Sequence, residues 1–113
     1  MRITGKEEAL QVLLSDVENL LEDLYQSGFD TVHDSTLSEL NHRTKQTAAY
    51  GMELLSVLLA QLSDGLAMRR LQMEKPADNL ANLYAQLCWY ISLCLDKIEI
   101  DKAAAYYKQE AAD

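Results

Sequence analysis

The sequence predicts an all-α fold, an antiparallel up-and-down four-helix bundle with a short C-terminal helical segment. Leucines recur every three or four residues along four long segments, which is the spacing of one face of a helix. The 113 residues include only four glycines and one proline, too few for the turns of a β-sandwich or barrel. Short loops between the segments favour antiparallel neighbours, so we expect a single helical-bundle domain over residues 1–113.

The first helix is predicted from Lys6 to Ser27. Thr4 and Glu7 have the spacing of a capping box at its start, and Gly28 can adopt the left-handed conformation that ends a helix. Its apolar residues form one stripe with a period of 3.6 residues. The stripe consists of Leu10, Leu13, Leu14, Val17, Leu20, Leu21 and Leu24.

The second helix is predicted from Thr36 to Tyr50, with Asp34 or Ser35 as its N-cap. Small residues occupy much of its inner face, so this face supplies little transfer free energy and we expect the least stable helix here. Gly51 either ends this helix or forms a kink into the next one. The inner face consists of Leu37, Leu40, Thr44, Ala48 and Gly51.

The third helix is predicted from Met52 to Met73, and its main face is made of leucines. Leu54, Val57 and Met68 widen that face, as expected for a helix covered by several neighbours. Gly65 inside the helix costs about 1 kcal/mol relative to alanine. The leucines of the main face are Leu55, Leu58, Leu59, Leu62 and Leu66.

The fourth helix is predicted over residues 79–100 and carries two apolar stripes. Trp89, Leu93 and Ile100 fall nearly opposite the core stripe when each residue advances about 100°. Residues 101–113 then form a short fifth helix or extend the fourth. The core stripe consists of Leu80, Leu83, Tyr84, Leu87, Ile91, Cys94, Leu95 and Ile98.

The second stripe has three interpretations. The tail folds back so that Tyr106 or Tyr107 covers Trp89, or the stripe binds a second copy or another protein, or it is simply partly exposed. A contact surface would comprise Trp89, Leu93, Ile100, Tyr106 and Tyr107. Tryptophan and tyrosine are enriched where binding energy concentrates, and an aligned apolar row differs from the scattered apolar residues of an ordinary surface.

The charge balance argues against two classes of partner. The formal net charge is -8, from 18 acidic and 10 basic residues, so the chain repels nucleic-acid phosphates and anionic membranes. No run is apolar enough to span a bilayer, and no secretory signal is visible, so we expect a cytoplasmic protein. Cys88 and Cys94 cannot bridge within one helix, which indicates reduced cysteines.

No group of residues predicts catalysis or a bound cofactor. Glu39 and His42 form a single E-x-x-H pair, whereas di-iron bundles use two such pairs and further glutamates. His33 lies between Asp30 and Asp34 without a nucleophile or a second histidine. We therefore expect no enzyme, no metal site and no cofactor.

Two stretches resemble known families. The stretch of roughly residues 17–98 is similar to helical segments that accompany SWIM zinc fingers in some bacterial proteins, with Gly28-Phe29 and Gly51-Met52 at the glycine positions. This chain has no zinc-finger cysteines, so no zinc or nucleic-acid role carries over. Residues 79–84, NLANLY, resemble the NLxxLY signature of flagellin export chaperones, which are small acidic helical bundles. Both resemblances imply a helical module that binds proteins.

We therefore expect a non-catalytic protein–protein interaction module of a bacterial cytoplasm, either an adaptor or a self-associating bundle, with a homodimer favoured. The first alternative is a small acidic export-type chaperone that binds a partner helix. The second is a metal-binding or enzymatic bundle, which would need polar residues converging from separate helices.

Overall fold

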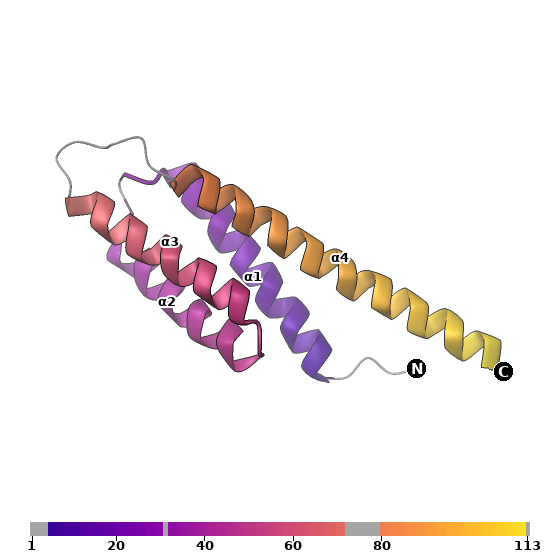
Figure 1. The fold of residues 1–113 in the computed structure, drawn as a ribbon. Coiled ribbons are helices and arrows are strands. Elements are labelled where there is room, and N and C mark those ends of the chain that lie inside the picture. Colours follow the sequence, from indigo (N-terminus) through magenta and orange to yellow (C-terminus); the bar gives the residue numbers. More distant parts are fainter. Residues whose placement is uncertain (1–4, 31, 72–79, 113) are drawn as a thin grey trace.

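The computed structural model describes residues 5–30, 32–71 and 80–112, and every regular element in these ranges is a helix (Figure 1). The helices are α1 (Gly5–Ser27), α2 (Asp34–Ala49), α3 (Glu53–Leu71) and α4 (Leu80–Ala112). The predicted all-α class and the four helices of the bundle are confirmed. Helix packing joins α1 to α2, α2 to α3, α3 to α4 and α4 to α1, so each helix lies beside two others.

Hydrogen bonds between helices show how neighbouring helices are oriented. The Tyr84 hydroxyl donates to the carbonyl oxygen of Leu21 at 2.7 Å, and the Gln11 amide donates to Glu99 at 2.7 Å. Residue numbers rise along α4 as they fall along α1, so these two helices run in opposite directions. Figure 1 shows the same relation, with the start of α1 beside the C-terminal half of α4.

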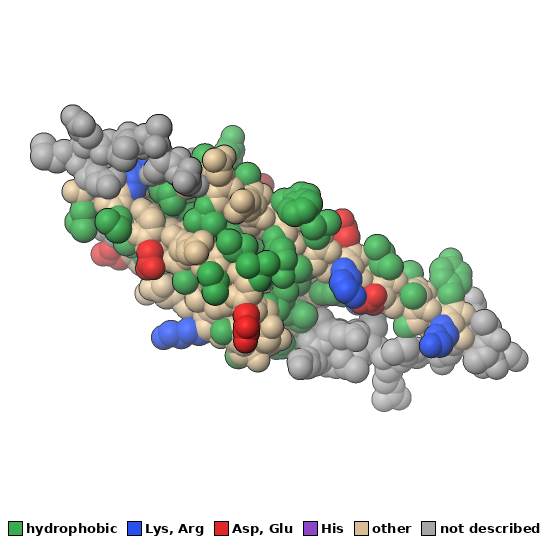
Figure 2. Space-filling model, in the orientation of Figure 1, with side chains coloured by type: hydrophobic (Ala, Val, Ile, Leu, Met, Phe, Trp, Pro, Cys, Tyr) green, Lys and Arg blue, Asp and Glu red, His purple; other side chains and the backbone are tan. Residues whose placement is uncertain are grey.

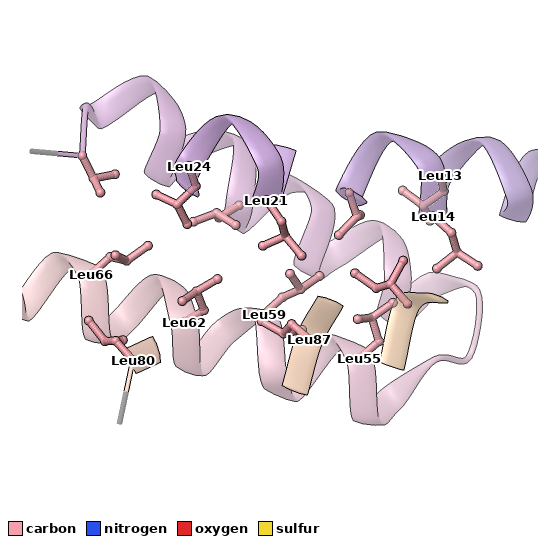
Figure 3. Packing of buried hydrophobic residues seen from close by; sticks show 14 residues of the cluster. Leu13, Leu14, Leu21, Leu24, Leu55, Leu59, Leu62, Leu66, Leu80 and Leu87 are labelled. Carbon is pink, nitrogen blue, oxygen red and sulfur yellow. The ribbon is translucent and has the colours of Figure 1, made fainter. Parts of the chain in front are cut away.

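The core is built almost entirely of leucine and lies where the four helices face one another (Figure 3). Full burial of a leucine side chain contributes about 1.5–3 kcal/mol, so these positions hold the helices together. From α2 the core receives only Leu40 and Thr47 as buried residues, in agreement with its thin apolar stripe. The buried apolar residues are Leu13, Leu14, Val17, Leu21, Leu24, Val32, Leu40, Leu55, Leu59, Leu62, Leu66, Leu80, Leu87 and Ile91.

Hydroxyl groups connect α2 to α3. The Ser56 hydroxyl donates to the carbonyl oxygen of Thr44 at 3.1 Å, and the Ser63 hydroxyl donates to the Asn41 side-chain oxygen at 3.2 Å. The buried Thr47 hydroxyl bonds to carbonyl oxygens of its own helix. Small side chains let two helices approach closely, which compensates α2 for its few leucines.

Two glycines end helices. Gly28 has φ +88° and Gly51 has φ +80°, the left-handed region in which glycine avoids a steric penalty. The prediction for Gly28 is confirmed, and Gly51 ends α2 rather than kinking it. The predicted N-cap of α2 is wrong, because His33 occupies that position without a side-chain hydrogen bond and Asp34 lies in the first turn. The capping box of Thr4 and Glu7 lies outside the described side chains.

Helix α4 differs most from its prediction. Residues 101–112 continue it without a break, so the predicted short C-terminal segment is not a separate element, and the alternative of an extension holds. Its 33 residues give it a length of about 50 Å, and its last turns project beyond α2 and α3 (Figure 1). The structure measures 65 × 22 × 22 Å. Within the described ranges, no helix combines the length and apolarity needed to cross a membrane.

Candidate interaction surface

A row of large apolar side chains runs along the outer side of α4. Trp89, Leu93, Ile100 and Tyr107 are between 45% and 69% exposed. With about 3.6 residues per turn, these four positions fall within a sector of roughly 40° around the helix. Four of the five predicted contact residues therefore share one line, which continues from the bundle onto the projecting part of α4.

Tyr106 does not belong to this row. It lies about 100° around the helix from Tyr107, and its ring meets the Tyr107 ring edge-on at a centroid distance of 5.8 Å. Tyr106 is also exposed, so it can contribute to a neighbouring side of the helix only. All five residues are exposed, and Tyr106 faces a different side of α4 from the other four.

The tail does not cover Trp89. Tyr107 is 18 positions further along the same continuous helix, which places it about 27 Å away at 1.5 Å per residue. The interpretation that Tyr106 or Tyr107 folds back over Trp89 is therefore wrong. Trp89 is 67% exposed, and within the described part of the chain its row has no covering element.

Helix α3 carries a second exposed row, which sequence reasoning assigned to the core. Leu54, Val57 and Met68 are between 51% and 62% exposed. The prediction that neighbouring helices cover them is wrong. The signal that was missed is their alignment with Gln61 and Asp64, because intervals of three and four residues place all five on one side of a helix. Polar residues in such a row indicate solvent.

The two rows lie near each other on one side of the molecule. Gly65 of α3 faces Leu80 of α4, and Met52 shares a cavity with Cys94, so α3 and α4 run in opposite directions. At about 1.5 Å per residue this register brings Leu54 and Val57 to the level of residues 88–91. Figure 2 shows hydrophobic side chains gathered in a band over α3 and α4. We call this surface the α3–α4 face, defined by Leu54, Val57, Met68, Trp89 and Leu93.

Carboxylates accompany the α3–α4 face. Glu53, Asp64 and Asp96 are exposed, and none of them forms an ion pair within the described ranges. Lys97, next to Asp96 in the chain, already pairs with Asp101 at 2.9 Å, which raises the pKa of its ammonium group. The uncompensated charge along the apolar band is therefore negative.

The two thiols are unsuited to nucleophilic chemistry. Cys88 and Cys94 are free and half-buried on the inner side of α4. Burial raises the pKa of both thiols by more than their hydrogen bonds to Tyr84 and Tyr90 lower it, and the Glu18 carboxylate adds to the rise for Cys88. Both thiols therefore stay protonated at neutral pH. Because the thiolate is the reactive form, they act as packing residues.

One small apolar cavity lies under α4, at the end of the bundle where α2 turns into α3. Its volume is about 270 Å³, and the Lys97–Asp101 ion pair stands at its edge. Its polar groups are the thiol of Cys94 and the ammonium and carboxylate of that ion pair, which bind each other. Its lining residues are Leu10, Leu14, Met52, Cys94, Lys97, Ile98 and Asp101.

The residues considered for metal binding have other positions and partners. Glu39 forms an ion pair at 2.9 Å with Arg43, one helical turn away. His42 is exposed on α2. Asp30 pairs with Arg69 at 2.5 Å, which ties the loop before α2 to α3. Within the part of the chain that the structure describes, no three histidine, cysteine or acidic side chains are grouped to hold a metal ion.

Comparison with known proteins gives no information on function. No family model, curated protein or solved structure matches this chain. The resemblances to SWIM-associated helices and to flagellin export chaperones stay predictions. The feature that calls for a function is the α3–α4 face.

Proposed function

We propose that this chain is a non-catalytic protein–protein interaction module that binds through the α3–α4 face. The supporting observation is the meeting of two exposed apolar rows, one from α3 and one from α4. Their five defining side chains expose on the order of 500 Å², within the range of the largest patches on monomeric proteins, which are often functional. Ile100 and Tyr107 extend this toward the roughly 800 Å² that each partner contributes to a standard interface.

The polar groups of the bundle support a binding role rather than catalysis. The Ser56 and Ser63 hydroxyls are used to join α2 to α3, and the two thiols are kept protonated by burial. A nucleophile needs an adjacent base or a lowered pKa. These hydroxyls and thiols have neither, whereas the exposed tryptophan and leucines suit an interface.

A homodimer is one form that this function can take. Since a twofold interface sets one surface against itself, a second copy would cover the α3–α4 face with another α3–α4 face. Light scattering after size exclusion, over a wide range of concentration, measures the mass directly. If two copies associate here, Trp89→Ala lowers the mass toward one copy while the helical circular dichroism is unchanged.

The matched control is Val12→Ser, which removes an equally exposed apolar side chain, 60% accessible, from α1. A dimer that persists in Trp89→Ala, or that is lost equally in Val12→Ser, would place self-association elsewhere. A monomer whose Trp89 fluorescence responds to no amphipathic helical peptide, basic or acidic, would contradict the proposed function as a whole.

A further inference from the structure

We infer that the occupant of the α3–α4 face is a basic amphipathic helix of another protein. The inference rests on the proposed function and names the class of partner. It starts from the three exposed carboxylates, Glu53, Asp64 and Asp96, that accompany the apolar band without an ion pair in the described ranges. A partner that covers the band must approach these charges.

A second copy matches this charge pattern poorly. Asp96 lies in the α4 row between Leu93 and Ile100, so two parallel α4 helices would bring Asp96 against Asp96. Two antiparallel α4 helices, with Trp89 of each facing Tyr107 of the other, cross near residue 98. There Asp96 of each copy would meet Ile100 of the other, while Lys97 and Glu99 already pair with Asp101 and Lys102 of their own chain. The parallel orientation is disfavoured because like charges oppose association, and the antiparallel one because it buries the Asp96 carboxylate against an apolar side chain.

A helix fits the shape of the face better than an extended strand does. Helices α3 and α4 satisfy their backbone hydrogen bonds internally, so this face has no strand edge to which a β-strand could add. Two adjacent helices with exposed apolar rows offer a surface on which a third helix can pack at about 8–10 Å. The apolar row of α3 from Leu54 to Met68 is about 21 Å long, which corresponds to roughly four helical turns.

The partner helix is therefore defined by its sequence pattern. Its apolar residues recur at intervals of three and four, so that they meet the rows of α3 and α4. Lysines or arginines flank this stripe on both sides, where one flank meets Asp64 of α3 and the other meets Asp96 of α4. These pairs lie at the rim of the contact, where charge governs specificity and the rate of association more than affinity.

Trp89 allows a direct test, because it is the only tryptophan in the chain and lies within the face. The probes are three synthetic helical peptides without aromatic residues. One has leucines in an amphipathic stripe and lysines elsewhere, the second has glutamates in place of the lysines, and the third has the leucine–lysine composition in scrambled order. Binding is followed by the blue shift of Trp89 emission.

The leucine–lysine peptide should bind at least about tenfold more tightly than the other two, with a blue shift on binding. Asp64→Lys combined with Asp96→Lys should remove this advantage, while Glu8→Lys combined with Asp23→Lys, the same charge change on α1, should retain most of it. Circular dichroism checks that each variant keeps its helices.

Equal binding of the glutamate peptide, or of the scrambled peptide, would overturn the assignment of a basic amphipathic helix. A dimer that is lost in Trp89→Ala would also overturn it, because the face would then belong to a second copy, but the proposed interaction function would remain. A monomer that binds none of the peptides would reject both.

Discussion

Gly65 shows how one residue sets the distance between two helices. A Cβ atom at this position would lie 2.5 Å from Cδ2 of Leu80, so the absence of a side chain lets the first turn of α4 approach α3 closely. The sequence predicts only the cost of a glycine inside a helix. The residue that fills the space is the buried Leu80, and its approach depends on how the two helices pack, which periodicity does not specify.

Half-buried thiols and phenols make stability depend on pH. Burial raises the pKa of Cys88 and Cys94 and also that of Tyr84 and Tyr90. The unfolded chain therefore loses these protons at lower pH than the folded chain does, and unfolding becomes more favourable as pH rises. We expect the free energy of unfolding to fall between about pH 8 and pH 11.

Urea unfolding at a series of pH values measures this dependence. A variant with Cys88→Ala and Cys94→Ala should lose less stability between about pH 8 and pH 10 than the native chain, since the contribution of the two thiols is absent. An identical slope in both proteins would show that the thiols have the same pKa in the folded and unfolded chains.

At the scale of elements, the two parts of α4 differ in how much of their surface is buried. From Tyr84 to Leu95 it buries Leu87 and Ile91 against the core, whereas from Ala103 to Lys108 it has no buried side chain. Backbone amides are protected from exchange in proportion to the stability of the local structure. The first part should therefore exchange only when the whole bundle unfolds, and the second should exchange by local fraying.

Hydrogen exchange followed by mass spectrometry or NMR tests this division. We expect protection of residues 87–95 to approach the global stability and that of residues 103–108 to lie within about 1 kcal/mol of zero. Equal protection along α4 would mean that something outside the chain stabilises the projecting turns. Repeating the experiment at low protein concentration separates self-association from intrinsic stability.

This sequence predicts where the helices lie better than it predicts which helices pack against each other. Leucine spacing and two glycines place α1, α2 and α3, because these signals are local. Whether residues 101–113 extend the fourth helix or form a fifth stayed open, because Ala103, Ala104 and Ala105 favour helix without forming an apolar stripe. The α3–α4 face was predicted only in its α4 half. Periodicity shows which residues share a side of α3, but not whether another helix covers Leu54 and Val57.

At the scale of the whole molecule, the shape is a rod rather than a sphere. The Cα radius of gyration is 16.8 Å, whereas a compact chain of this length has about 13 Å. The projecting turns of α4 contribute to the difference (Figure 1). We expect small-angle X-ray scattering from single copies to give a radius near 17 Å and a longest dimension of at least 65 Å.

Small-angle X-ray scattering of the variant Ala103→Pro tests whether the projecting turns of α4 set the longest dimension. Proline in a helix interior costs about 3 kcal/mol and bends or breaks the helix. Because Ala103 is exposed and lies beyond the core, the longest dimension should fall while the melting temperature of the bundle changes little. Ala103→Ser is the control that keeps the helix. A native radius near 13 Å would show that the end of α4 folds onto the bundle in solution.

The pairing of α1 with α4 has a consequence for synthesis on the ribosome. The hydrogen bond from Tyr84 to Leu21 joins residues 63 positions apart, whereas the bonds from α3 to α2 span 12 and 22 positions. The hairpin of α2 and α3 can therefore complete its contacts before α4 has left the ribosome. During that interval the leucines of α1 and α3 that will meet α4 are open to water, so the nascent chain is most prone to aggregate just before its last helix emerges.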